Sequence, residues 1–258
     1  MNSIEKDAML KEKFKAVLPS SFGVEPVAKT KLAVFDFDET LVQSQDMFYK
    51  LMIEAMVRLK LPCSEDIVKD IFAKWDKEYF GWGNNLEEQK VIYQSKYQPM
   101  ITKLSNDPYF LGQMVLFDGM KDTIKLLAKT DIALAIASSR DLTSILTFLR
   151  KEGIKDYFIM VEATEGGKNF EEKPNPSIVN YISQEIGISL DNAVMIGDSV
   201  CDIKMGKNAG MKTIAAGYGK YSNKDKLLAE KPDALIKEMT RSSDMVFTIQ
   251  KLVKSKSI

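Results

Sequence analysis

The sequence predicts an α/β protein, with a parallel sheet covered by helices and a helical domain inserted after the first strand. Short apolar runs recur along the chain, amphipathic segments separate them, and one long segment, 45–112, contains no strand-like run. The middle runs are almost wholly apolar rather than alternating, which is typical of strands buried on both faces of a parallel sheet. Strands that alternate with helices indicate a doubly wound, Rossmann-like core.

The expected strands begin with "KLAVFDF" at 31–37 and end with the short run "DALI" at 233–236. Four others lie between them, at 131–139, 157–163, 192–198 and 212–218. Apolar residues at helical spacing predict helices over 142–153 and 176–187. Both predicted helices end on a glycine, the residue that most easily adopts the left-handed conformation of a helix C-terminus.

The inserted segment has a helical pattern throughout. Three amphipathic stretches fill it, at 46–59, 64–80 and 85–104, and glycines and prolines punctuate them. We therefore expect three parts in the chain. These are an N-terminal extension with a peripheral helix over 1–30, a core over 31–44 and 113–258, and a helical cap over 45–112.

The composition excludes several classes of function. Lys plus Arg and Asp plus Glu both number 36, so the formal net charge is zero, and we expect neither nucleic acid nor a membrane surface as a partner. The chain has no histidine, so acid–base chemistry must fall to carboxylates, Lys, Tyr or Cys. Cys63 and Cys201 form neither a metal-ligand pattern nor a disulfide framework, and no signal-peptide core or membrane-spanning run is present. We expect a cytoplasmic location.

Two aspartates interrupt the first apolar run, "VFDFDETLV". Side chains two residues apart on an extended segment point to the same face, so Asp36 and Asp38 are expected to converge at the strand end. Acids at a strand end can be simple turn formers. Two neighbouring carboxylates repel, however, and each is costly to desolvate, unless a cation lies between them or one holds a proton.

Other polar residues follow the remaining strands. Parallel α/β sheets bind ligands at the carboxyl ends of their strands, so we expect these residues to meet at one edge. They are Thr40 after the first strand, Ser138 and Ser139 after the second, Lys173 before the helix at 176–187, and Asp198 and Asp202 after the fourth. Carboxylate oxygens suit Mg²⁺, a carboxylate can serve as a nucleophile, and a lysine can neutralise a phosphoryl group.

The segments "DFDET", "ASS", "EEKPNP" and "GDSVCD" resemble, in this order, the four signature motifs of the haloacid dehalogenase-like phosphohydrolase superfamily. The tail "DIKMGKNAGMKTIAAGYG" is similar to that of its phosphoglycolate phosphatase-like branch, which carries a helical cap between the first two motifs. The resemblance covers residues 31–236.

The resemblance implies a role for each residue. Asp36 would be the nucleophile, Asp38 the general acid and base, and Ser138 and Lys173 the holders of the phosphoryl group, with Ser139 adding a backbone N–H. Mg²⁺ would be bound by Asp36, Asp198 and the backbone carbonyl of Asp38. Thr40 and Asp202 would stand behind these ligands, although Asp202 is also a suitable acid for a helix N-terminus.

The resemblance implies a Mg²⁺-dependent phosphatase that hydrolyses a small phosphorylated metabolite through an aspartyl-phosphate. A dehalogenase is disfavoured because that branch does not need the second aspartate. A sugar phosphomutase, a phosphonate hydrolase and a non-catalytic phosphate-binding scaffold remain as alternatives. Glu39 departs from the branch, which often has glycine there, so it adds a carboxylate and loses the backbone freedom of glycine.

Overall fold

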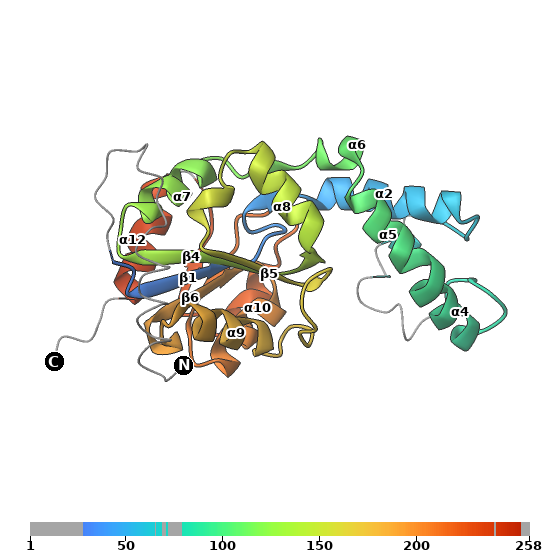
Figure 1. The fold of residues 1–258 in the computed structure, drawn as a ribbon. Helices are drawn as coiled ribbons and strands as arrows, with labels where there is room; N and C mark the ends of the chain where they lie inside the picture. Colours follow the sequence, from blue (N-terminus) through green and yellow to red (C-terminus); the bar gives the residue numbers. More distant parts are fainter. Residues whose placement is uncertain (1–27, 65, 69–70, 72–78, 240, 254–258) are drawn as a thin grey trace, which may run out of the picture. The chain divides into compact units, whose positions relative to one another are not determined.

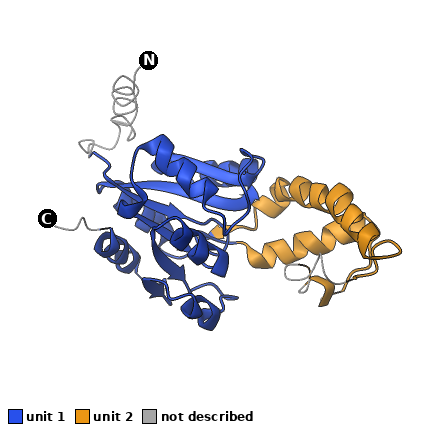
Figure 2. Ribbon diagram, turned by 90° about the horizontal axis from the view of Figure 1, so that it is seen from below, with its two compact units in different colours: residues 1–43, 116–258 blue, residues 44–115 orange. Residues whose placement is uncertain are grey.

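The computed structural model describes residues 28–64, 66–68, 71, 79–239 and 241–253 (Figure 1). The chain divides into two compact units, residues 1–43 with 116–258, and residues 44–115 (Figure 2). The chain passes between the units twice. At these two connections it forms the short strands β2 (Val42–Gln43) and β3 (Val115–Leu116), which pair with each other. The helix expected within residues 1–30 and most of the helix expected over 64–80 lie outside the described residues.

The larger unit contains a six-stranded sheet in which every pair of neighbouring strands is parallel. All six expected strands are present, so the predicted α/β class is confirmed. The order across the sheet is β5-β4-β1-β6-β7-β8, which is the doubly wound order, and it reverses direction between β1 and β6. The strands are β1 (Lys31–Phe35), β4 (Ile132–Asp141), β5 (Met160–Glu165), β6 (Ala193–Gly197), β7 (Lys212–Ala216) and β8 (Ala234–Ile236).

Helices cover both faces of this sheet (Figure 1). One face carries α7 (Met120–Ala128), α8 (Leu142–Lys151) and α12 (Ser242–Leu252), and the other carries α9 (Ser177–Ile186) and α10 (Val200–Asn208). A short helix, α11 (Lys224–Ala229), links β7 to β8. The helices predicted over 142–153 and 176–187 are confirmed as α8 and α9.

Strand β1 is buried on both faces because its side chains alternate between two apolar layers. Leu32 and Val34 pack in one cluster with Ile178, Val179 and Ile182 of α9. Each such side chain, fully buried, contributes about 1.5–3 kcal/mol to stability. Gly187 ends α9 with φ +74°, as the sequence predicts.

Apart from Val115 of β3, the regular elements described in the smaller unit are helices. The stretch predicted as helical over 85–104 is α4 (Leu86–Ile92), a π-helical turn (Tyr93–Tyr97) and α5 (Gln98–Ser105), with α2 (Gln45–Arg58) before it and α6 (Pro108–Leu111) after it. Pro99 has no N–H to donate to the preceding turn, which accounts for the irregular winding there. Trp82 is buried in this unit, its ring 4.8 Å from that of Tyr97, and its Nε1 donates to the carbonyl oxygen of Pro62.

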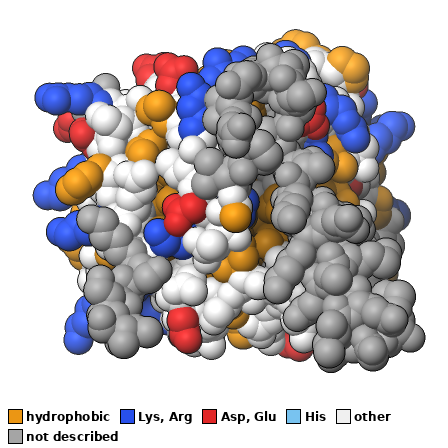
Figure 3. Space-filling view, turned by 60° about the vertical axis from the view of Figure 1, so that its left-hand side comes forward, with side chains coloured by type: hydrophobic (Ala, Val, Ile, Leu, Met, Phe, Trp, Pro, Cys, Tyr) orange, Lys and Arg blue, Asp and Glu red, His pale blue; other side chains and the backbone are white. Residues whose placement is uncertain are grey.

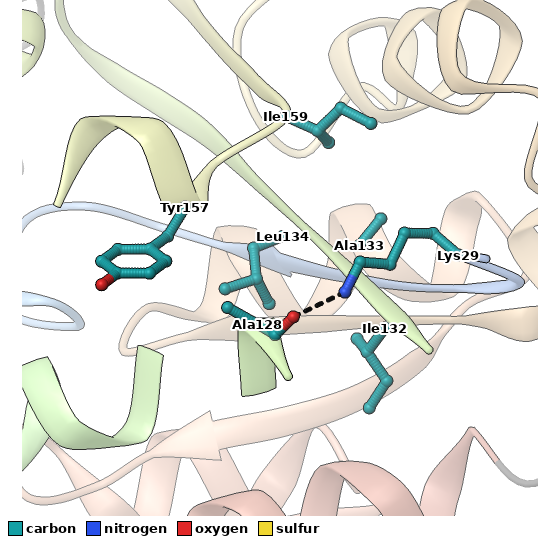
Figure 4. Close-up of a pocket in the computed structure, with 7 residues that line it drawn as sticks. All are labelled: Lys29, Ala128, Ile132, Ala133, Leu134, Tyr157 and Ile159. Atoms are coloured by element: carbon teal, nitrogen blue, oxygen red, sulfur yellow. Dashed lines mark hydrogen bonds between the residues drawn. The ribbon is translucent and has the colours of Figure 1, made fainter. Parts of the chain in front are cut away.

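A small cavity of about 20 Å³ lies at the amino end of β4 (Figure 4). Beside it, Lys29 Nζ donates to the carbonyl oxygens of Ala128 and Thr130, at 2.8 and 2.5 Å, which satisfies the C-terminal end of α7. Burial lowers the pKa of Lys29, and Asp131 partly opposes that shift. The volume suffices for about one water molecule, so the cavity is a feature of packing.

On the face seen in Figure 3, the basic, acidic and hydrophobic side chains of the described residues are interspersed. Among the described residues, no helix has both the length and the apolar character needed to cross a bilayer.

Candidate active site

Asp36 follows β1 directly, and its backbone N–H donates to the carbonyl oxygen of Ile196 on β6 at 2.8 Å. This places it at the point where the strand order reverses, where parallel α/β sheets bind their ligands. Its side chain is 10% exposed, whereas that of Asp38 is 35% exposed. The two carboxylates face different cations, Lys173 and Arg140 respectively.

Lys173 joins two of the predicted acids. Its Nζ donates to Asp36 Oδ1 at 2.5 Å and to Asp202 Oδ1 at 2.7 Å, and its side chain is 6% exposed. Burial favours the neutral amine, but the adjacent carboxylates of Asp202 and Asp36 outweigh it and hold the pKa of Lys173 above its ordinary value. Lys173 is therefore a buried cation beside Asp36 and Asp202.

Asp202 combines a helix-capping contact with a bond to Lys173. It is the third residue of α10 and forms a reciprocal capping box with Ser199, whose backbone N–H and hydroxyl both donate to Asp202 Oδ2. Its other oxygen accepts the bond from Lys173. Gly197 makes this possible, because a Cβ there would lie 2.3 Å from the Cβ of Asp202.

Three carboxylates form a compact acidic cluster. Asp36, Asp198 and Asp202 each offer an oxygen within 4.8 Å of the others. Both oxygens of Asp202 are already engaged by Lys173 and Ser199, so Asp36 and Asp198 are better placed to take a cation. The Thr40 hydroxyl donates to Asp198 Oδ1 at 3.3 Å. An all-oxygen donor set of this kind fits Mg²⁺.

The carboxylates resist ionisation in the absence of a cation. Burial raises the pKa of Asp36 to about 7; Lys173 opposes this shift, and Asp202 adds to it. Burial also raises the pKa of Asp198 well above its usual range. The negative charges of Asp36, Asp202 and Glu39 raise it further. A divalent cation would relieve this repulsion, because metal ligation favours the ionised carboxylates.

The end of β4 supplies the next polar groups. Ser138 is 1% exposed, and its Oγ accepts a hydrogen bond from the backbone N–H of Arg140 at 3.1 Å. This bond leaves the hydroxyl proton available as a donor. Ser139, one residue on, is exposed.

Strand β4 runs further than the sequence predicts. The expected strand ends at residue 139, but β4 continues through Arg140 to Asp141, and the Arg140 side chain is 4% exposed and bonded to Asp38. Asp141 does begin a helix as expected, because its carboxylate accepts a bond from the backbone N–H of Ser144. The spacing of the residues could have indicated this position, because Arg140 is two residues after Ser138 and so shares its face of the strand.

The loop after Asp38 is fixed by contacts within the larger unit. Glu39 adopts φ +54°, the left-handed conformation that glycine would adopt without strain. Its carboxylate lies 3.1 Å from the position a Cβ would take at Gly219. Tyr218 donates its hydroxyl to the carbonyl oxygen of Thr40 at 2.5 Å, a contact that the sequence did not predict.

Comparison with known proteins gives consistent results. A phosphoglycolate phosphatase of Vibrio vulnificus is 29% identical over 160 residues, which are 62% of this chain and 64% of that protein. The pyrophosphatase PpaX of Halalkalibacterium halodurans is 24% identical over 83% of this chain and 95% of its own length.

Solved structures share the fold. A haloacid dehalogenase-like hydrolase from Streptococcus pneumoniae superposes with a TM-score of 0.63 at 18% identity, covering 85% of this chain and 98% of that one. The family model for haloacid dehalogenase-like hydrolases matches residues 33–216, well over half of the chain. The resemblance predicted from the motifs is therefore confirmed, and the chain belongs to the haloacid dehalogenase-like hydrolase family.

Proposed function

We propose that this protein is a Mg²⁺-dependent phosphatase that hydrolyses a small phosphorylated metabolite through an aspartyl-phosphate on Asp36. The observation that carries the proposal is the position of Asp36. It lies at the reversal point of the sheet, bonded to the buried cation Lys173 and beside the carboxylate of Asp198. An anionic nucleophile next to fixed positive charge suits attack on a phosphate ester, whose own charge must be neutralised.

The chain's own residues divide the reaction into two halves. In the first, an oxygen of Asp36 attacks phosphorus, the bond to the leaving oxygen breaks, and Asp38 gives that oxygen a proton. In the second, water attacks the phosphorus of phospho-Asp36, Asp38 takes the water proton, and inorganic phosphate leaves. The Ser138 hydroxyl and Lys173 Nζ hold the phosphoryl oxygens throughout.

Mg²⁺ is proposed to bind Asp36, Asp198 and the backbone carbonyl of Asp38. Thr40 and Asp202 are proposed to steady this site from behind, Thr40 through Asp198 and Asp202 through Lys173. When bound, the cation would neutralise charge on the phosphoryl group as it transfers.

The proposed substrate is a small molecule because residues 45–112 are proposed to act as a cap that limits its size. The relatives' names support a phosphorylated substrate and include both a phosphoglycolate phosphatase and a pyrophosphatase. A phosphate monoester is the proposed class, since the single lysine described at the Asp36 site matches one phosphoryl group. A cytoplasmic location is proposed with it.

The test is turnover on a panel of phosphate monoesters, pyrophosphate and a phosphonate, with Mg²⁺ and with EDTA. The proposal predicts Mg²⁺-dependent phosphate release from a small monoester, and loss of that activity in Asp36→Asn. Transfer between sugar phosphates without net release would indicate a mutase. Phosphate binding without turnover on any compound would indicate a scaffold and overturn the proposal.

A further inference from the structure

Arg140 holds the carboxylate of Asp38 through three hydrogen bonds. Its Nε donates to Oδ1 and Oδ2 at 3.0 and 2.9 Å, and its Nη2 donates to Oδ1 at 2.8 Å. Two nitrogens of one planar guanidinium that engage both oxygens fix the plane of the carboxylate as well as its position. A lysine in this place would supply the charge without that orientation.

Arg140 is itself firmly placed. Its side chain is 4% exposed, compared with 35% for Asp38, and its backbone N–H is bonded to Ser138 Oγ. Its guanidinium carbon lies 5.9 Å from the centre of the Phe37 ring, within the range of a cation–π contact. Because β1 and β4 are paired neighbours, a rigid part of the sheet presents the arginine, and the more exposed Asp38 is the group being held.

We infer that Arg140 is a positioning residue that orients Asp38 for proton transfer, an inference that rests on the proposed function. In the first half-reaction, the proton on Asp38 passes to the leaving oxygen as its bond to phosphorus breaks. In the second, that carboxylate takes a proton from the water that displaces Asp36 from phosphorus. The two transfers return Asp38 to its starting state. They use Oδ2, which accepts only one of the three bonds from Arg140 and so keeps a lone pair for the proton, and they need that oxygen aimed at the reacting atoms.

The choice of leaving group separates this role from phosphate binding. p-Nitrophenolate leaves without a proton, whereas the alkoxide of glycerol phosphate must be protonated. Arg140→Met should therefore lower kcat/KM for glycerol phosphate at least tenfold and change kcat/KM for p-nitrophenyl phosphate less than twofold. An equal loss with both substrates would mean that Arg140 binds the phosphoryl group or supports the fold, and would overturn the inference.

Arg140→Lys tests orientation against charge. Lysine keeps the charge but lacks the planar guanidinium that bonds both carboxylate oxygens, so kcat/KM for glycerol phosphate should also fall at least tenfold. Full activity in this variant would contradict the inference. Arg150→Lys is the control, because Arg150 is an exposed arginine on α8, in the same unit as Arg140, and has no part in the proposed site. It should leave both activities unchanged.

A double-mutant cycle gives the second readout. If Arg140 acts through Asp38, adding Arg140→Met to Asp38→Asn should change kcat/KM less than twofold for either substrate. The same tenfold loss in that background would overturn the inference. Melting temperatures within a few degrees of wild type confirm that the variants fold. Wild-type turnover that requires Asp36 supports the proposed function independently of Arg140. Arg140 variants with full activity would therefore contradict this inference and leave the proposed function standing.

Discussion

At the residue scale, the acidic cluster opposes folding when no cation is bound. Asp36, Asp198 and Asp202 share a small volume in which Lys173 is bonded to two of them. Lys173 does not compensate fully, because burial still raises the pKa of Asp36 to about 7 and that of Asp198 well above its usual range. We therefore expect a bound cation to stabilise the cluster, and the cost of the cluster to appear in the metal-free protein.

Asp36→Asn tests this cost. The Asp36 carboxyl has its ordinary pKa of 3.8 in the unfolded chain and one of about 7 in the folded protein, so the folded state binds more protons between these values. Stability therefore falls as the pH rises from about 4 to about 7. In EDTA at pH 8, Asp36→Asn should melt above wild type, by about 2–4 °C per kcal/mol gained, and the gap should close towards pH 4. A lower melting temperature than wild type at pH 8 would contradict the account.

Gly197→Ala should damage both stability and activity. The added Cβ would fall 2.3 Å from the Cβ of Asp202, and overpacking of this kind costs about 1–3 kcal/mol. The displaced Asp202 would then hold Lys173 poorly, so phosphatase activity should fall at least tenfold. Gly153→Ala is the control: its positive φ of 66° brings strain, but no atom lies within 4 Å of the new Cβ. It should lower the melting temperature and keep the activity, whereas equal activity in the two variants would exclude the Asp202 argument.

At the element scale, most of the fold was predictable from the sequence because apolar periodicity reports burial directly. All six strands and the helices α8 and α9 follow from it. The C-terminal end of β4 does not, because its last two residues, Arg140 and Asp141, are polar and resemble a turn and a helix start. The pairing of Asp141 with Glu165 on β5 and the bond from Arg140 to Asp38, 102 residues away, exist only once the sheet has formed. The π-helical turn between α4 and α5 could not be predicted either, because a hydrophobic pattern does not distinguish it from an α-helix.

The start of α8 offers a test at this scale. Asp141 accepts a hydrogen bond from the backbone N–H of Ser144 at 2.9 Å, so Asp141→Ala should lower stability by about 0.5–2 kcal/mol. Asp141→Asn keeps an oxygen acceptor and should lose less. Chemical denaturation of the two variants measures the difference. Equal losses in both would show that the charge of Asp141, rather than its capping bond, stabilises the helix.

At the scale of the whole molecule, residues 44–115 form a compact unit joined to the rest of the chain by two connections. The site residues all belong to the other unit, which explains why sequence motifs could locate them and why those motifs name no substrate. We expect the helical unit to set specificity, because nothing in the described acidic cluster distinguishes one phosphate ester from another.

Replacing residues 46–112 with a short Gly/Ser linker tests this division of labour. The remaining core should bind Mg²⁺, and it should lose most of its rate and its preference among phosphate esters. The comparison is kcat/KM on small phosphate esters and on a folded phosphoprotein, for the intact and shortened chains. A shortened chain with full rate and selectivity would refute the cap, as would an intact protein that prefers the phosphoprotein.

The most direct test of the central claim is to trap phosphate on Asp36. Wild-type protein turning over a small phosphate monoester with Mg²⁺ is quenched in acid, reduced with borohydride and digested, and the peptide containing residues 31–50 is examined by mass spectrometry. The account predicts that homoserine, the reduction product of an aspartyl-phosphate, replaces Asp36 only when substrate and Mg²⁺ are both present. Unmodified Asp36 in an enzyme that is visibly turning over, or modification at another residue, would contradict it.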